Sequence, residues 1–155
     1  PVTTNFDPTT IEGQVEAAII AEDAAYARCI SQLPECDVDS VVILGEGDYA
    51  VGIRDLLEQL NSQDLAAENT ESIQTVVREV ELFTNGSEAE AIVCTVDSSR
   101  IFQPSTGAVA ENADGSYVSR QRRVVLIKVR EVWLISGNVL LDEAVGEEND
   151  LCATT

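Results

Sequence analysis

Four cysteines and no histidine occur in this chain of 155 residues, and the cysteines place the strongest constraint on its fold. Cys29 and Cys36 lie on either side of a turn at Pro34, Cys94 lies within a predicted strand, and Cys152 lies near the C-terminus. We favour the disulfide bonds Cys29–Cys36 and Cys94–Cys152, because the first is local and the second would tie a loose tail to a sheet. Zinc-bound or free thiols are the alternative, although neither pair has the spacing typical of structural zinc sites.

The net charge of −19, from 28 acidic and nine basic side chains, excludes several classes of function. A surface this acidic repels phosphate backbones and anionic lipids, so we expect no nucleic-acid partner. No stretch reaches the roughly 18 apolar residues that a membrane span needs, so we expect no membrane span. The sequence contains no phosphate-binding loop, dinucleotide fingerprint or calcium loop, and we expect no cofactor and no metal.

Helices are predicted in the first half of the chain. Asp7 and Pro8 favour a helix start, with Asp7 as N-cap, and apolar residues then recur at helical spacing to about residue 32. Residues 37 to 44 predict a short helical turn. Residues 49 to 67 predict a second long helix, because Ile53 and Leu57 fall on one side of it.

The periodicity becomes strand-like from residue 72 onward. Asn85-Gly86 predicts a hairpin between strands 73–84 and 89–97, and residues 101 to 109 extend the second strand after an irregular stretch. Residues 112 to 115 predict a second turn. Long strands follow, and their predicted bounds are 116–130 and 132–142.

Helices followed by antiparallel strands indicate an α+β fold, with N-terminal helices packed on a curved antiparallel sheet that forms a cone. We expect an N-terminal linker at 1–7, a single cone domain at 8–145, and a C-terminal tail at 146–155 anchored by Cys152. The chain opens with Pro1-Val2-Thr3-Thr4, which favours an exported protein whose signal has been removed.

This order of elements, with Val129-Arg130-Glu131-Val132-Trp133 near the end, resembles the nuclear transport factor two-like superfamily, also called the cystatin-like cone. The local pair Cys29 and Cys36, the strand Val93-Cys94-Thr95-Val96-Asp97 and the late Cys152 resemble its secreted bacterial and lipoprotein members. The resemblance spans roughly residues 8 to 145. It implies a conical pocket, but the superfamily includes enzymes, ligand carriers and structural adaptors, so the fold implies little about function.

Superfamily enzymes usually place a His, Asp or Tyr deep in the cone, and this chain has no His. Asp97 and Tyr26 are the catalytic candidates, with the carboxylate as base and the hydroxyl as donor to an oxyanion. Asp97 could instead begin a turn with Ser98 and Ser99, which we favour. The candidate ligand pocket comprises Tyr26, Tyr49, Asp97, Arg123 and Trp133.

Five of the nine basic residues lie between 120 and 130. Strand alternation puts most of them on one face and Arg123 on the other, where it points into the cone. Pairing across the sheet with carboxylates of neighbouring strands is favoured over binding of an anion. The residues on one face are Arg120, Arg122, Lys128 and Arg130, and the expected carboxylates are Glu79, Glu81, Glu88 and Glu90. Trp133 is favoured as core packing over a ligand-stacking surface.

The sequence thus favours a secreted or surface-tethered, non-enzymatic accessory module that binds an unknown protein partner or a small apolar ligand. An isomerase or hydrolase that uses Asp97 and a Tyr is the first alternative. A structural subunit of an extracellular assembly, forming a homo-oligomer through the face of its sheet, is the second.

Overall fold

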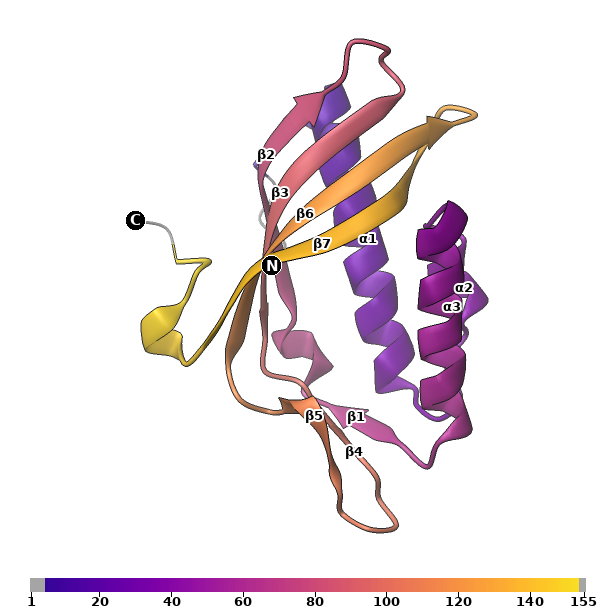
Figure 1. Ribbon diagram of the computed structural model, residues 1–155, viewed down its shortest axis with the longest axis vertical. Helices are drawn as coiled ribbons and strands as arrows, with labels where there is room; N and C mark the ends of the chain where they lie inside the picture. Colours follow the sequence, from indigo (N-terminus) through magenta and orange to yellow (C-terminus); the bar gives the residue numbers. More distant parts are fainter. Residues whose placement is uncertain (1–4, 154–155) are drawn as a thin grey trace.

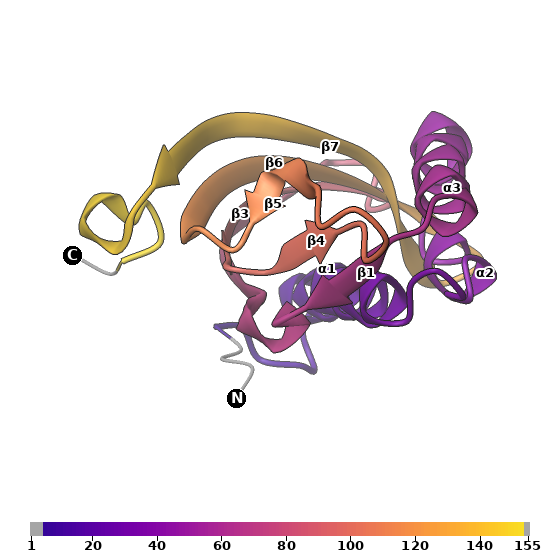
Figure 2. The ribbon, with the colours of Figure 1, turned by 90° about the horizontal axis from the view of Figure 1, so that it is seen from below.

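The computed structural model describes residues 5–153 and has the α+β architecture expected from the sequence. A strongly curved four-stranded antiparallel sheet in the order β2-β3-β6-β7 arches over helix α1, and α2 and α3 flank the β7 side (Figures 1 and 2). The elements are α1 (Ile11–Ser31), α2 (Asp39–Val42), α3 (Gly47–Ser62), β1 (Ala66–Glu68), η1 (Thr70–Ser72), β2 (Gln74–Leu82), β3 (Glu88–Asp97), β4 (Arg100–Phe102), β5 (Val109–Asp114), β6 (Val118–Val129), β7 (Val132–Val145) and η2 (Glu147–Asn149).

Helix α1 begins later than expected, because its N-cap is Thr10 and not Asp7. The Thr10 hydroxyl accepts a hydrogen bond from the Gly13 amide at 3.1 Å, as an N-cap does. The Asp7 carboxylate instead accepts from the amide and hydroxyl of Thr9, in a turn that precedes the helix. This turn lies so close that a Cβ on Gly13 would be 2.0 Å from the Asp7 carbonyl oxygen.

Helix α3 ends at Ser62, five residues before the predicted end at residue 67. Ala66–Glu68 forms strand β1, which pairs with β4 through Ala66 and Phe102. Alanine and leucine favour a helix here, but the partner strand supplies backbone hydrogen bonds that no local pattern reveals. The short helical turn expected between 37 and 44 is present as α2.

The main sheet follows the predicted hairpins closely. Gly86, with a φ of 68°, lies in the turn between β2 and β3. Strands β6 and β7 meet at a two-residue turn, where Arg130 and Glu131 both have positive φ, as a tight hairpin requires. Strand β7 continues to Val145, three residues beyond the predicted end at 142.

A second, three-stranded sheet in the order β1-β4-β5 replaces the predicted strand 101–109 and the turn 112–115. Residues 103–108 form the turn, in which the Gly107 amide donates to the Gln103 carbonyl at 2.7 Å. Residues 112–114 belong to strand β5, although Asn112 has a positive φ of 61°. This small sheet lies across the lower end of α1 in Figure 1.

Both ends of the described chain are attached to the main sheet or to α1. The buried Glu16 carboxylate accepts from the Asn5 and Phe6 amides, so residues 5 and 6 are attached to α1. Residues 1–4 of the expected linker and residues 154–155 of the expected tail lie outside the described residues. Disulfides join Cys29 to Cys36 and Cys94 to Cys152, the pairing favoured from the sequence.

The hydrophobic core has two parts along α1. Val15 and Ile19, in the first half of the helix, pack against the concave face of the main sheet. Ala25 and Cys29, in the second half, pack against α2, α3 and the small sheet. Between these two parts the interior is polar. None of the helices formed by residues 5–153 is long and apolar enough to cross a membrane.

The Cys94–Cys152 bond closes a loop of 58 residues, whereas Cys29–Cys36 closes one of seven. The chain-entropy model predicts that C94A/C152A lowers the free energy of unfolding by about 4 kcal/mol and C29A/C36A by about 2 kcal/mol. Urea denaturation of the two variants measures this difference. A larger loss from C29A/C36A would contradict the assignment of the C-terminal bond as the main covalent anchor.

Candidate functional site

A pocket of about 130 Å³ lies on the concave side of the main sheet, between α1, η1, β3 and β6. It occupies the polar gap between the two parts of the core. Of the five pocket residues expected from the sequence, Tyr26 and Asp97 line it, and Tyr49, Arg123 and Trp133 do not. The lining residues are Asp23, Tyr26, Ile73, Thr95, Asp97, Arg120 and Arg122.

The inner end of the pocket holds an ion pair between α1 and β6. The Arg122 Nη2 lies 2.6 Å from the Asp23 Oδ2 and 2.7 Å from the Thr95 hydroxyl. The same Asp23 oxygen accepts a short hydrogen bond from the Thr75 hydroxyl on β2. Because both charged side chains are mostly buried, loss of either one would leave the other charge unpaired inside the fold.

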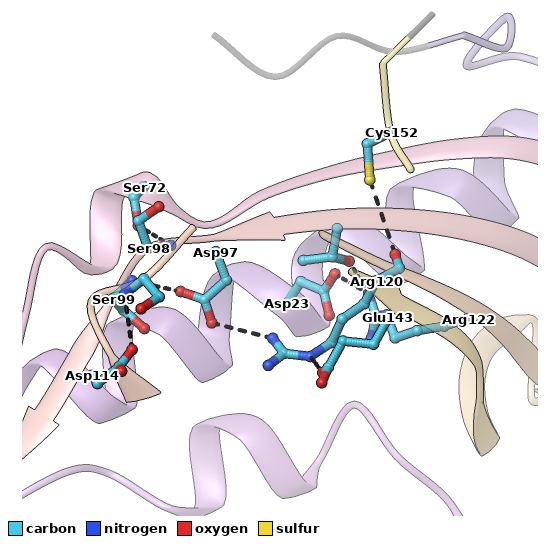
Figure 3. Close-up of polar contacts among 12 residues, drawn as sticks. Asp23, Ser72, Asp97, Ser98, Ser99, Asp114, Arg120, Arg122, Glu143 and Cys152 are labelled. Atoms are coloured by element: carbon cyan, nitrogen blue, oxygen red, sulfur yellow. Dashed lines mark hydrogen bonds and ion pairs between the residues drawn. The ribbon is translucent and has the colours of Figure 1, made fainter. Parts of the chain in front are cut away.

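A second ion-pair group lies nearer the surface (Figure 3). The Arg120 Nε donates to the Glu143 carboxylate at 2.7 Å, and its Nη1 lies 3.6 Å from the Asp97 Oδ2. The other oxygen of Asp97 accepts from the Ser99 amide at 2.7 Å. Asp97 therefore has two roles in the structure: it begins the turn favoured from the sequence, and it also lines the pocket.

Strand alternation explains why arginines enter the pocket. In β6, residues 118, 120, 122, 124 and 126 face α1, and in β3 their partners are 97, 95, 93, 91 and 89. Arg123 has the opposite orientation: it pairs with Ile92, its side chain is 45% exposed, and its Nε lies 3.9 Å from Glu90. The expectation that Arg123 points into the cone is wrong, because the face with Val124 and Leu126 is the buried one.

The expected pairing of the basic cluster with carboxylates of β2 and β3 is also largely wrong. Only Arg123 approaches one of them, Glu90. Arg120 and Arg122 instead contact carboxylates of α1, β7 and the end of β3, and Lys128 contacts Glu131 in the adjoining turn. The four glutamates lie on the convex face or at its margin, whereas most of the basic side chains lie on the concave face.

Glu22 and Tyr49 form a buried pair behind the pocket. The Tyr49 hydroxyl donates to the Glu22 Oε1 at 2.7 Å, joining α3 to α1. Burial, followed by the neighbouring Asp23 carboxylate, raises the pKa of Glu22 to about 7. Burial also raises the pKa of Tyr49, with Glu22 as the second cause, so the phenol stays protonated.

Trp133 lies in the core cluster with Val15 and Ile135 and does not line the pocket. Its indole ring packs against the first half of α1, which agrees with the core role favoured from the sequence. The Nε1 atom is buried and has no hydrogen-bond partner among residues 5–153. Trp133 is therefore a packing residue and has no contact with the polar pocket.

Tyr26 and Asp97, the catalytic candidates, lie on the same pocket but are poorly suited to proton transfer. Asp97 accepts from the Ser99 backbone amide and lies beside Arg120, so both of its oxygens already have partners. Burial, followed by the charge of Asp97, raises the pKa of Tyr26 and keeps its hydroxyl protonated. The arrangement offers hydrogen-bond donors to a ligand more readily than it offers a base.

The inner half of this site, namely Asp23, Thr95 and Arg122, was not predicted from the sequence as part of a pocket. A signal was present: Glu22 and Asp23 interrupt an otherwise apolar stretch of the first helix. Charged residues inside an apolar helical segment are rarely buried unless they are paired. The partner of Asp23 on β6, Arg122, could not be identified from the sequence, because the position of the strand relative to the helix is not known from it. Among residues 5–153, no three metal-binding side chains are grouped.

Comparison with known proteins supports the fold. No family model and no curated protein matches this sequence. The intermembrane space region of chloroplast protein ARC6 has a similar structure, with a TM-score of 0.70 and 12% identity over 86% of this chain and 98% of that one. A ketosteroid isomerase-like protein from Erwinia carotovora atroseptica has a TM-score of 0.55 and 15% identity over 84% and 95% of the two chains.

A third similar structure is a putative calcium/calmodulin dependent protein kinase II association domain from Xanthomonas campestris. Its TM-score is 0.52, with 14% identity over 96% of both chains. At these identities the likeness concerns the fold alone. The architecture shared with the ketosteroid isomerase-like protein agrees with the expected cone.

The raised pKa of Glu22 has a consequence for stability. Because the folded protein holds this proton more tightly than the unfolded chain, whose pKa is near 4.5, stability falls as the pH rises from about 4.5 to about 7. Glu22→Gln keeps an acceptor for Tyr49 and removes the titration. The wild type is expected to lose up to about 3 kcal/mol of its free energy of unfolding between pH 5 and pH 8 through Glu22. We expect the Glu22→Gln variant not to show this loss.

Urea denaturation of both proteins at pH 5 and pH 8 measures this effect. The difference between the two proteins isolates Glu22 from the other titrating groups. Equal losses of stability in the wild type and in Glu22→Gln would show that Glu22 is already ionised in the folded protein at pH 5.

Proposed function

We propose that this protein is a non-enzymatic binding module of the nuclear transport factor two-like superfamily, which holds a small polar ligand in the pocket beneath its sheet. The observation that carries the proposal is the donor-rich lining around Arg122. The ligand class is one with acceptor oxygens, such as a small carboxylic acid or amide. This differs from the apolar ligand expected from the sequence, because four of the seven lining residues are charged.

Two donors of the lining have no partner within the described part of the chain. The Arg122 Nε is buried and unpaired, although Nη2 of the same guanidinium binds Asp23 and Thr95. The Tyr26 hydroxyl makes no hydrogen bond with residues 5–153, yet burial keeps it protonated. The Arg122 Nε is therefore a costly buried donor, whereas the Tyr26 hydroxyl is free to donate to a ligand oxygen in the same pocket.

Charge and size limit the ligand further. Two aspartates and two arginines line the pocket, so the lining as a whole is neutral. A ligand with several negative charges would meet Asp23 and Asp97, whereas a neutral or singly charged ligand would not. The volume of 130 Å³ is well below the roughly 300 to 1,000 Å³ of pockets for drug-sized molecules, which favours a small ligand.

Binding is favoured over catalysis because the carboxylates of the lining are already engaged. An isomerase or hydrolase that uses Asp97 needs a carboxylate free to accept a proton. Asp97 is bound by the Ser99 amide and lies beside Arg120, and Asp23 is bound by Arg122. Glu22 has a pKa suited to proton transfer but does not line the pocket, so a ligand there would not contact it.

The two disulfides support an extracytoplasmic location. Disulfides persist in oxidising compartments and are uncommon in the cytosol. Both bonds lie in partly or fully buried positions, since Cys29 and Cys94 are almost completely inaccessible. We infer that the protein is exported and works outside the cytosol or at the cell surface.

A homo-oligomer through the face of the sheet stays a prediction. The convex face is crossed by the segment that carries Cys152, and Glu81 lies opposite Glu90 on it. Two such faces would bring like charges together, which opposes association. Sedimentation of the purified protein measures its oligomeric state directly.

Tyr26→Phe tests the pocket, because it removes one hydroxyl that has no protein partner. We expect the variant to retain its stability and to bind small carboxylates or amides about tenfold more weakly, the cost of one lost hydrogen bond to a charged or strongly polar group. Titration of the labelled protein with acetate, acetamide and benzoate, followed by backbone NMR shifts, measures binding. The matched control is Tyr117→Phe, whose hydroxyl donates to Asp150 outside the pocket.

Shifts centred on Thr95 and Arg122 that weaken in Tyr26→Phe, and not in Tyr117→Phe, support the proposal. Absence of shifts at the lining with every probe, or equal affinities in the two variants, would contradict it.

A further inference from the structure

Strand β7 is an edge of the main sheet, and its first half is already covered by the chain itself. The Glu46 amide donates to the Ile135 carbonyl at 2.8 Å, and the Ile135 amide donates to the Leu44 carbonyl at 3.1 Å. Gly45 therefore forms a parallel bridge with Ile135. This edge thus accepts an extended segment through backbone hydrogen bonds.

Beyond Gly137 the outer edge of β7 has no paired segment among residues 5–153. The only ladder of this part of the strand is with β6, on its inner side. Figure 2 shows β7 along the outer border of the arch, with α3 beside its first part and no element beside its later part. The edge ends at Val145, whose carbonyl accepts from the Asn149 side chain at 3.0 Å. We call residues 138 to 144 the free edge.

The free edge carries three consecutive large apolar residues. Val139, Leu140 and Leu141 are 46%, 54% and 46% exposed. Val139 lies opposite Arg123 on the convex face, Leu140 lies opposite Arg122 on the concave face, and Leu141 is the extra residue at a β-bulge. Edge strands normally carry charged or small residues that prevent pairing with other chains, so exposed apolar side chains here are typical of a contact surface.

Charge decides between the possible occupants of the free edge. Asp142 follows the apolar residues, and Glu147 and Glu148 lie in the next turn, whereas Glu143 is already paired with Arg120. A second copy of this chain would bring the same carboxylates and a further charge of −19 to the contact. A segment with lysine or arginine beside its apolar residues would instead meet opposite charge, which favours association.

We propose that the free edge of β7 binds an extended segment of a partner protein in which apolar residues alternate with Lys or Arg. The segment adds to the sheet as a further strand, next to the position that Leu44–Glu46 occupies along the first half of the same edge. Backbone groups that point outward from β7 supply hydrogen bonds, as in other cases of strand addition. Val139 and Leu141 contact its apolar side chains, and the acidic residues contact its basic ones. This inference goes beyond the pocket and does not depend on it.

A synthetic peptide that alternates valine with lysine and arginine is the probe. We expect it to bind the intact, oxidised protein and to slow amide hydrogen exchange at residues 138 to 144. The test variant is V139K/L141K, which replaces apolar contacts by charges that repel the probe. The control is V51K/L56K on α3, which changes the same residue types at similar exposures of 59% and 42% and the net charge by the same amount.

The expected result is binding to wild type and V51K/L56K that is weakened at least about tenfold in V139K/L141K. A peptide of the same length and charge, in which proline replaces every second valine, cannot form a regular strand, and we expect it not to bind. Equal affinity of the two protein variants for the probe, or equal affinity of the protein for the probe and the proline peptide, would show that binding is general electrostatic attraction. Either result would overturn the proposal. A dimer of the free protein that V139K/L141K dissociates would also overturn it, because the occupant would then be a second copy.

Discussion

The packing of α1 against the concave face of the sheet is the contact on which the rest of the structure depends. Val15 and Ile19 are almost completely buried against Val77, Val93 and Leu126, and this apolar contact sets the distance and direction of the helix under the sheet. One turn after Ile19 the same helix face carries Glu22 and Asp23. The rigid helix brings these carboxylates into the interior, so the apolar half of the contact determines where the polar half must lie.

The strands supply the partners that make this buried polarity tolerable. Unpaired charges are expelled from protein interiors, and paired ones persist only with good geometry and further hydrogen bonds. Asp23 receives Arg122 and Thr75, whereas Glu22 receives the Tyr49 hydroxyl, and burial raises the pKa of Glu22 to about 7. The two adjacent carboxylates on α1 therefore have different properties: one anchors an arginine that lines the pocket, and the other is a titrating group behind it.

The sheet offers two surfaces to other molecules, and they differ in chemistry. The concave side ends in a small pocket with donors and balanced charge. The later part of β7 presents an open edge with apolar residues and nearby carboxylates. Arg122 and Leu140 face each other across β6 and β7, and Arg120 pairs with Glu143, so the two surfaces share neighbouring residues. A contact at the edge would thus lie close to the outer ion pair of the pocket.

The sequence by itself determined the α+β class, the long first helix, the hairpin at Asn85-Gly86 and the long final strand pair, because these depend on periodicity and turn residues that act locally. It also indicated the disulfide partners and placed Tyr26 and Asp97 near a cavity through the family resemblance. Only the tertiary structure decided that Arg122 and not Arg123 faces inward, that residues 66–68 form a strand, and that Trp133 does not line the pocket. Each of these depends on which face of a strand is covered or on a partner distant in sequence. Such contacts leave no local pattern, because alternation along a strand defines two faces without stating which one the helix will cover.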